Sequence, residues 1–377
     1  MAQTPPFTVG IEEEYLLVDR VTRNLVADPP PEFMAALKDR LDDQVSPELL
    51  RCQVEVGTRP ASCLKEAARE LKALRRAVVE AAGDIDAAPI AASTHPFADW
   101  TPQRATDKER YTRLFSDIGA PAQRMLICGQ HVHVGLDDDA LRIDLLNQVR
   151  YFLPHLLCLS TSSPFWRGRD TGLKSYRLAA FDEMPRTGLP EPFYSYGEYR
   201  RHVDLLVDNG IIEDASKLWW DVRPSARFPT LELRICDVST HIDDAITVAA
   251  LFVSVLRYLW RLKTRNVTWR RYSTMLIAEN RWRAQRYGSE GTLLDFGRGA
   301  LVPYPELLAE LIDMVREDAE ALGCLDEVCR APEILDRGTS AHRQLAIYSV
   351  ARERGADEPK ALCKVVDWLI EETAAGL

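Results

Sequence analysis

The chain has 377 residues, and its 47 lysines and arginines against 57 aspartates and glutamates give a formal net charge of −10 at pH 7. A negative field of this kind repels nucleic-acid backbones and anionic membranes, so neither is expected as a partner. The 46% of hydrophobic and 28% of charged residues are ordinary for a globular protein and exclude disorder over most of the chain.

Targeting and cysteine signals are those expected of a cytoplasmic protein. The first residues, MAQTPPFTVGIEEEY, have neither a basic nor an apolar segment, so no secretory signal is predicted. The richest apolar run, 245–260, is interrupted by Thr247, Ser254 and Arg257 and predicts a buried helix rather than a membrane span. The eight cysteines include no CxxC pair and are interpreted as reduced, mostly buried thiols.

The N-terminal part predicts two strands followed by a helix. Alternating polar and apolar residues indicate strands over 7–18 and 51–57. An apolar stripe with a period of 3.6 residues predicts a helix over 62–82, with Ser62 as its N-cap and Gly83 as its end.

The next part adds two strands and a long helix. Residues 87–93 predict a strand that Pro89 confines to an edge or a bulge, because proline cannot donate to a ladder. Residues 124–136 alternate cleanly and predict another strand. The helix predicted over 140–159 contains Pro154, so we expect a kink or two separate helices.

The remainder passes from an irregular segment to helices. Residues 161–199 are rich in Ser, Gly, Pro and Arg, and an irregular segment of this length is usually functional or mobile. Residues 218–222 and 229–238 predict strands. Helices are then predicted over 242–265, 270–287, 304–322, 340–353 and 358–373.

Strands and helices are therefore segregated along the chain. A strand-rich part covers about 7–240 and a helical part about 241–377. This order predicts an α+β fold with an antiparallel or mixed sheet, rather than alternating strands and helices around a parallel sheet. The sequence contains no GxGxxG or P-loop motif for binding a nucleotide.

Four of the predicted strands carry ionisable or polar side chains on one face. Residues two apart in a strand point to the same side of a sheet. The pairs are Glu12 with Glu14, Gln53 with Glu55, His131 with His133, and Glu232 with Arg234. On the first strand the opposite face carries Ile11 and Glu13, and on the other three it is apolar.

These side chains favour a site for divalent cations. For any one strand, alternation describes equally well a sheet with one wet face, and that alternative stays open. Carboxylates with one imidazole suit Mg²⁺ or Mn²⁺, and an arginine beside them suits a phosphate held between metal and guanidinium. The alternative is zinc at the HVH sequence, although no third histidine lies in a comparable context.

Glu48 is harder to place from its spacing. It stands seven residues before Glu55, and an odd spacing puts two residues on opposite faces of a straight strand. Both can serve one site only if a bend or bulge lies between Pro47 and Gln53. Without that bend, Glu48 is interpreted as a surface residue.

The motifs GIEEEYLLVD, GQHVHVGL and LELRICD, with the pair Glu48 and Glu55, resemble the type 2 glutamate-cysteine ligase family of YbdK-like carboxylate-amine ligases. The resemblance runs from about Phe7 to the late helices, including ENRWRAQRYG at 279–288. It implies a glutamine synthetase-like catalytic domain over the whole of 1–377. In such a domain a curved, mainly antiparallel sheet forms a funnel flanked by helices, here with a helical C-terminal third.

The resemblance also implies the roles of the ionisable residues. One metal, nearest the ATP β- and γ-phosphates, would be held by Glu12, His131 and Glu232, and a second, nearest the acid substrate, by Glu14, Glu48 and Glu55. Catalytic roles fall to Glu55 and to Arg234, which would contact the transferring phosphoryl group. His133 would make a nucleotide or indirect contact rather than ligate.

Further arginines are candidates for binding ATP and the acid. Arg223 and Arg227 match the order of the superfamily's nucleotide-binding arginines, and Arg177 and Arg186 lie in a segment that resembles its substrate-side loop. Asn280 and Arg283 match a family motif and are further substrate-binding candidates. For each of these residues a structural or solvated role is the alternative.

The activity implied is an ATP-dependent ligation with Mg²⁺ or Mn²⁺. A carboxylate, expected to be the γ-carboxylate of glutamate, takes the ATP γ-phosphoryl group to form an acyl phosphate, and an amine such as cysteine displaces phosphate. The segment 161–200 is the candidate lid. The alternatives are a guanidino phosphotransferase-like kinase and a non-catalytic module that binds ATP and metal. The resemblance further implies a homodimer.

Overall fold

The structure is a computed structural model that describes residues 4–377, apart from the side chains at positions 110, 112 and 123. Its main sheet has seven strands in the order β10-β11-β5-β1-β3-β2, with β4 also paired to β1. The strands are β1 (Val9–Asp19), β2 (Val45–Pro47), β3 (Gln53–Gly57), β4 (Ala87–Ile90), β5 (Gln130–Gly135), β10 (Val222–Pro224) and β11 (Thr230–Leu233). Every pairing in this sheet is antiparallel, as the sequence predicted.

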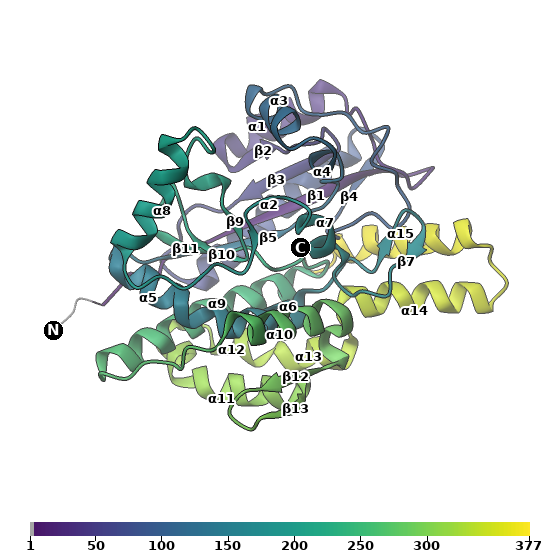
Figure 1. Cartoon of the computed structure of the whole chain (residues 1–377). Coiled ribbons are helices and arrows are strands. Elements are labelled where there is room, and N and C mark those ends of the chain that lie inside the picture. Colours follow the sequence, from purple (N-terminus) through teal and green to yellow (C-terminus); the bar gives the residue numbers. More distant parts are fainter. Residues whose placement is uncertain (1–3) are drawn as a thin grey trace.

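Helices surround this sheet and make up most of the chain after it (Figure 1). The α-helices before residue 241 are α1 (Pro31–Leu41), α2 (Leu64–Gly83), α3 (Glu109–Ile118), α4 (Ala120–Gln123), α5 (Asp139–Val149), α6 (Leu153–Ser160), α7 (Tyr176–Phe181) and α8 (Tyr196–Asp208). Those after it are α9 (Ile242–Thr264), α10 (Thr274–Tyr287), α11 (Tyr304–Leu322), α12 (Leu325–Cys329), α13 (Ala331–Arg337), α14 (Ser340–Glu353) and α15 (Glu358–Ala374).

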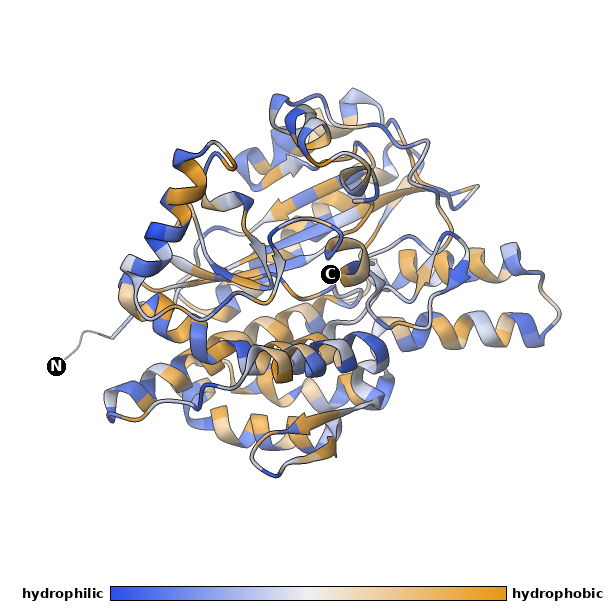
Figure 2. Cartoon of the chain, viewed as in Figure 1, coloured by the Kyte–Doolittle hydropathy of each residue, from blue (hydrophilic) through white to orange (hydrophobic). Residues whose placement is uncertain are grey.

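Two large hydrophobic clusters hold the sheet between helices. One joins β1, β5 and β11 to α5, α6 and α9, and the other joins β1, β3 and β4 to α1, α2 and α15. Apolar residues follow the strands and the helices packed beside them, while polar residues lie toward the outside (Figure 2). Burial of these apolar surfaces is the main force that fixes the strands in place.

Among the described residues, α9 is the one helix long and apolar enough to suit a membrane span, and 72% of its most apolar window is buried inside the fold. The prediction of a buried helix over this run is therefore confirmed. The cysteines are free, and five of the eight are buried, also as predicted.

The register of β1 with its neighbours decides which side chains meet. Glu12 lies opposite His131 on β5, and Glu14 lies opposite Glu55 on β3. On the other side of β5, His133 lies opposite Glu232 of β11. Because opposite residues in antiparallel strands project to the same side, the register gathers the predicted ionisable residues on one face of the sheet.

Several predicted elements differ from those observed. The strand predicted over 124–136 begins only at Gln130. The helix over 140–159 is two helices, α5 and α6, separated at Arg150–Phe152 just before Pro154, so the predicted interruption is confirmed. The N-cap of α2 is Cys63, because both the backbone and the hydroxyl of Ser62 donate to Glu66 instead. Pro89 lies in β4, which pairs only with β1, so its predicted edge position is confirmed.

Other elements were not predicted, except that β9 (Trp219–Trp220) lies within the strand predicted over 218–222. The segment 161–199 holds α7 and the start of α8, and three two-stranded ladders were missed. These ladders are β6 (Phe165–Trp166) with β7 (Arg169–Asp170), β8 (Thr187–Gly188) with β9 (Trp219–Trp220), and β12 (Thr292–Asp295) with β13 (Ala300–Pro303). The small pairs are too short to show a periodic pattern, so only contacts between distant segments define them.

Candidate active site

A cleft of about 480 Å³ lies over the face of the sheet that carries the ionisable side chains. All but three of the predicted site residues line it, namely Glu12, Glu14, Glu48, Glu55, His131, His133, Arg177, Arg223, Arg227, Glu232 and Arg234. They come from β1, β3, β5, β10, β11 and α7 and from the segments that follow β2, β10 and β11. Residues separated by more than 200 positions thus share one cavity.

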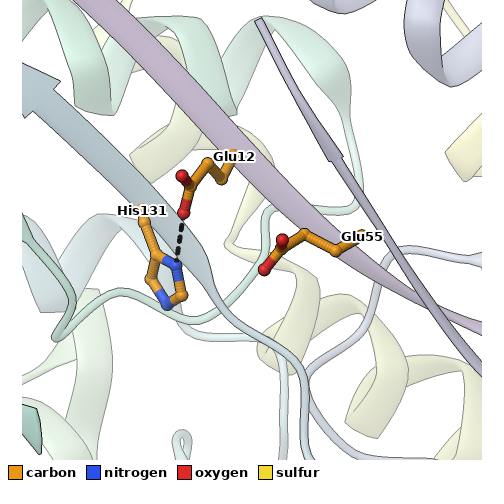
Figure 3. A group of neighbouring side chains, drawn as sticks. All are labelled: Glu12, Glu55 and His131. Atoms are coloured by element: carbon orange, nitrogen blue, oxygen red, sulfur yellow. Dashed lines mark hydrogen bonds and ion pairs between the residues drawn. The ribbon is translucent and has the colours of Figure 1, made fainter. Parts of the chain in front are cut away.

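Glu12, Glu55 and His131 form the first convergent group. Each offers a ligand atom within 4.8 Å of the others, and they point into a common space from three neighbouring strands (Figure 3). The Nδ1 atom of His131 lies 3.1 Å from Glu12 Oε2, and its buried Nε2 atom has no hydrogen-bond partner among the described residues. Burial and the charge of Arg234 lower the pKa of His131 to about 4, which leaves a neutral imidazole of the kind that binds metals.

Glu14, Glu48 and Glu55 form the second group, again with ligand atoms within 4.8 Å of one another. Burial and the charge of Glu48 raise the pKa of Glu14 to about 8. The same causes, with the charges of Glu12 and Glu14, raise the pKa of Glu55 well above its usual range. Carboxylates crowded in this way repel each other unless a cation or proton lies between them.

Glu48 joins this group because the chain turns where the sequence required a bend. Strands β2 and β3 pair as a hairpin, with Pro47 opposite Val54, and the backbone N–H of Gln53 donates to Leu50 O at 2.9 Å. This turn brings Glu48 back toward Glu55. Its interpretation as an isolated surface residue is therefore wrong, and the bend predicted between Pro47 and Gln53 is present.

Glu232 differs from the other carboxylates because two arginines already bind it. Arg223 donates from Nε to Oε2 at 2.8 Å and from Nη2 to Oε1 at 3.1 Å, and Arg234 donates from Nη1 to Oε1. Burial alone would raise the pKa of Glu232, but the charges of Arg234 and Arg223 hold it well below its usual range. The convergent group thus pairs Glu12 and His131 with Glu55, whereas Glu232 was expected there.

His133 lies between Glu12, in the first convergent group, and Glu232, which the arginines bind. Its Nδ1 atom is 2.9 Å from Thr230 Oγ1, and its Nε2 atom is 3.4 Å from Glu12 Oε1. Burial lowers its pKa, but the contact with Glu12 and the charge of Glu232 outweigh burial and raise it overall. The exposed ring of Phe228 stands edge-on at 6.1 Å, on the loop that carries Arg227.

Arg177 reaches the cleft from α7 and is 3% exposed. Its Nη1 atom donates to the carbonyl oxygens of Arg234 at 3.1 Å and Ile235 at 3.3 Å, and its guanidinium lies 5.5 Å from the centre of the Phe181 ring. Its buried Nε atom has no hydrogen-bond partner among the described residues. A buried donor of this kind is expected to have a ligand as its partner.

Three predicted site residues are used elsewhere. Arg186 donates to Lys217 O at 3.1 Å and stacks on Trp219, so it does not line the cleft. Asn280 exchanges hydrogen bonds with the backbone of Leu294, and Arg283 donates to Thr292 O at 2.7 Å. Both therefore tie α10 to the β12–β13 hairpin, which the sequence did not predict. None of the three is retained in the candidate site.

Two features in and behind the site were not predicted. Apolar side chains line part of the cleft, among them Leu49, Tyr111, Leu114, Met125, Ile127, Phe181, Met184 and Trp219. Behind β1, Glu13 pairs with Arg75, a fully buried residue that also donates to Ser239 O and Thr240 O. The charge of Glu13 on an otherwise apolar face was the one signal that pointed to a buried partner.

Sequence comparison identifies relatives over nearly the whole chain. The family described as "Glutamate-cysteine ligase family 2(GCS2)" matches residues 8–364. The chain belongs to this family. A Rhodospirillum rubrum protein named "Putative glutamate--cysteine ligase 2" is 57% identical over 99% of this chain and 97% of its own length. A Jannaschia protein of the same name is 55% identical over 99% of both chains. As a family member, the protein is an ATP-dependent carboxylate-amine ligase.

Solved structures show the same fold at low sequence identity. The glutamate-cysteine ligase of Francisella tularensis, solved in complex with AMP, matches with a TM-score of 0.66 at 15% identity over 98% of this chain and 93% of that one. A bifunctional glutathione synthetase from Pasteurella multocida matches with a TM-score of 0.67 at 16% identity, over 97% of this chain and 52% of that one. The predicted glutamine synthetase-like class, with an antiparallel sheet and helices, agrees with these likenesses.

Proposed function

We propose that the protein activates the γ-carboxylate of glutamate with ATP and couples it to an amine such as cysteine. The observation that carries the proposal is the meeting of five ligand residues with three arginines in one cleft, Glu12, Glu14, Glu48, Glu55 and His131 with Arg177, Arg223 and Arg234. A carboxylate-rich cluster suits cations, and neighbouring guanidinium groups suit phosphates and carboxylates. The names of the relatives favour this ligase over the phosphotransferase and the non-catalytic module.

The chemistry of the donor set fits two Mg²⁺ or Mn²⁺ ions. Oxygen ligands with one neutral imidazole are typical of these ions, and the cleft offers no thiolate that would favour zinc. We assign Glu12, Glu55 and His131 to one ion and Glu14, Glu48 and Glu55 to the other. When bound, the ions would neutralise charge on the phosphates and the attacking carboxylate.

The arginines are then placed to hold the anionic parts of both substrates. The Nε atom of Arg234 is buried and has no hydrogen-bond partner among the described residues, so Arg234 is the candidate to contact the transferring phosphoryl group. Arg223 and Arg227, at the same end of the cleft, are assigned to the nucleotide. Arg177, near Glu14, is assigned to the α-carboxylate of the acid, which a guanidinium binds in two-point fashion.

The reaction proceeds by two displacements. An oxygen of the γ-carboxylate forms a bond to the γ-phosphorus as the bond to ADP breaks, and the amine nitrogen then attacks the acyl carbon, loses a proton and expels phosphate. The residues named contribute by positioning and by electrostatic stabilisation. Because an acyl phosphate hydrolyses in water, the cleft must close, and the more exposed part of the segment 161–200, after α7, is the proposed lid.

The test is ADP release by the purified full-length protein with Mg²⁺, ATP, glutamate and a panel of amines including cysteine. Mass spectrometry identifies the amide. We expect Glu55→Gln and Arg234→Ala to abolish product, and Glu290→Gln, at a side chain 73% exposed outside the cleft, to leave it unchanged. A phosphorylated product without amide would instead favour the kinase, and wild-type rates in both cleft variants would refute the assignment. The predicted homodimer is tested separately by light scattering.

A further inference from the structure

Asp237 is a fully buried carboxylate to which the proposed reaction gives no role. It follows β11, and it does not line the cleft. Its Oδ2 atom accepts from the backbone N–H of Ser162 at 2.8 Å and from the hydroxyl of Ser163 at 2.7 Å, and Oδ1 accepts from the hydroxyl of Ser175 at 2.8 Å. A buried charge is costly, and three donors on one carboxylate indicate that this one has a specific use.

The three donors come from two separate stretches of chain that Asp237 joins. Ser163 N–H donates to Lys174 O at 3.2 Å, and Tyr176 N–H donates to Ser163 O at 2.8 Å. The backbone N–H of Arg177 donates to Ser163 Oγ at 3.0 Å, so the Ser163 hydroxyl proton must point to Asp237. The hydrogen bonds therefore run in one direction, from Arg177 through Ser163 to Asp237.

Asp237 also lies beside Gly129, and the Arg177 guanidinium packs against the backbone of that glycine. Asp237 forms a backbone bridge with Gly129, and the N–H of Gly129 donates to Glu14 Oε2 at 2.7 Å. A Cβ atom at position 129 would clash with the Arg177 guanidinium, whose Cζ atom would lie at 2.9 Å. Arg177 is thus held at its backbone by the serine network and at its guanidinium by the glycine and the carbonyls of β11's extension.

We propose that Asp237 is a positioning residue that fixes the start of α7 and so places the Arg177 guanidinium for the carboxylate of the acid substrate. The inference rests on the proposed function for the identity of that acid. Asparagine is a weaker replacement for Asp237, because it has no charge and only one terminal acceptor: its amide group would either face the Ser162 N–H or force the Ser175 hydroxyl to turn and accept. Loss of the charge therefore weakens the hold on Ser163 or Ser175, and on Arg177 with them.

The experiment measures steady-state kinetics of Asp237→Asn, Arg177→Ala and the double variant. We expect Asp237→Asn to raise KM for glutamate about tenfold, the usual effect of losing a well-placed charged hydrogen bond, while KM for ATP and kcat change less than about twofold. In the Arg177→Ala background the same substitution should add no further increase, since the residue it acts through is gone. Ser175→Ala, a milder change, should raise KM for glutamate about threefold.

Asp318→Asn is the matched control. Asp318 is equally buried and bonded, but to Arg257 and Arg261 in the helical part of the chain. It should cost stability without changing KM for glutamate. If Asp237→Asn raises KM by the same factor with and without Arg177, or lowers kcat and both affinities together, the positioning role is refuted.

Crystal structures of the wild type and Asp237→Asn decide the inference even if the acid is not glutamate. We expect the Arg177 guanidinium to leave the carbonyls of Arg234 and Ile235 while Glu14 and Glu55 stay in place. An unmoved Arg177 would overturn the inference. Absence of ADP release by the wild type with glutamate and every amine would refute the proposed function alone, since the crystallographic comparison needs no substrate.

Discussion

The two ends of the cleft differ in how their carboxylates are balanced by neighbouring charges. At the end formed by β1, β2 and β3, Glu14, Glu48 and Glu55 converge, and the pKa values of Glu14 and Glu55 are raised by burial and mutual repulsion. At the end formed by β10 and β11, Glu232 is bound by Arg223 and Arg234. At the first end the charges of Arg177 and Arg234 only partly offset burial and the charge of Glu48, so this cluster favours binding of cations. The second is already balanced, so an incoming phosphate must share the arginines with Glu232.

The largest expected effect is a difference in unfolding free energy between variants at the two ends of the cleft. Glu232→Gln leaves Arg223 and Arg234 without their buried partner, and removing one member of a buried ion pair costs about 3 to 5 kcal/mol of unfolding free energy. Glu55→Gln removes repulsion instead and should not lower that free energy in metal-free buffer. Urea unfolding in EDTA at pH 8 measures both. Equal losses in the two variants would show that the two ends do not differ in charge balance.

A second prediction concerns His95, whose protonation lowers the unfolding free energy in acid and therefore must be avoided when the two ends of the cleft are compared. His95 is buried and neutral, with Nδ1 accepting from Ala98 N–H at 2.9 Å and Nε2 bonded to Arg23 O at 2.9 Å. Burial lowers its pKa to about 4, so its contribution is complete above pH 6.5 and is lost as the pH falls toward 4. The linkage amounts to about 2 kcal/mol at pH 5.

The measurement is unfolding free energy at pH 8 and pH 5 for the wild type and His95→Asn, which keeps an acceptor near the Nδ1 position. Part of the wild-type loss on acidification should be missing in the variant, by about 2 kcal/mol. His155, whose pKa is also lowered to about 4 by burial, provides a second buried histidine for the same test. An identical pH dependence in wild type and variant would show that His95 does not titrate in this way.

Cation binding gives the third prediction. Mg²⁺ at about 100 times its dissociation constant should raise the unfolding free energy by about 2.7 kcal/mol, because the ion binds only the folded cluster. Glu55→Gln, which takes a ligand from both groups, should remove most of this stabilisation, whereas Glu290→Gln should keep it. Thermal unfolding with and without EDTA reports the difference. Stabilisation retained by Glu55→Gln would place the cations elsewhere.

The sequence predicted the faces of the strands better than their partners. A period of two residues put Glu12 with Glu14 and His131 with His133 on shared faces, and the antiparallel register then brought them together. That Glu55, and not Glu232, lies with Glu12 and His131 depends on side-chain contacts across strands far apart in sequence. No local pattern contains that information.

In the helical part of the chain, by contrast, a motif was predicted to bind substrate, but its side chains hold a neighbouring hairpin in place. ENRWRAQRYG carries Asn280 and Arg283 on α10, and both side chains bond the β12–β13 hairpin. The hairpin follows within fifteen residues of Asn280, but its strands are four residues each, too short to be detected by alternation. Because the hairpin was not predicted, no structural partner was expected for these two side chains.

Asn280→Ala therefore gives the smallest of the expected effects and separates packing from substrate binding. It removes two hydrogen bonds, from Nδ2 to Leu294 O at 2.9 Å and from Leu294 N–H to Oδ1 at 2.7 Å. The loss should be about 1 to 2 kcal/mol of unfolding free energy, because the Leu294 backbone groups are left without partners. KM for glutamate and for the amine should not change, since Asn280 does not line the cleft. A raised KM with unchanged stability would return Asn280 to the substrate site and would extend the cleft toward α10.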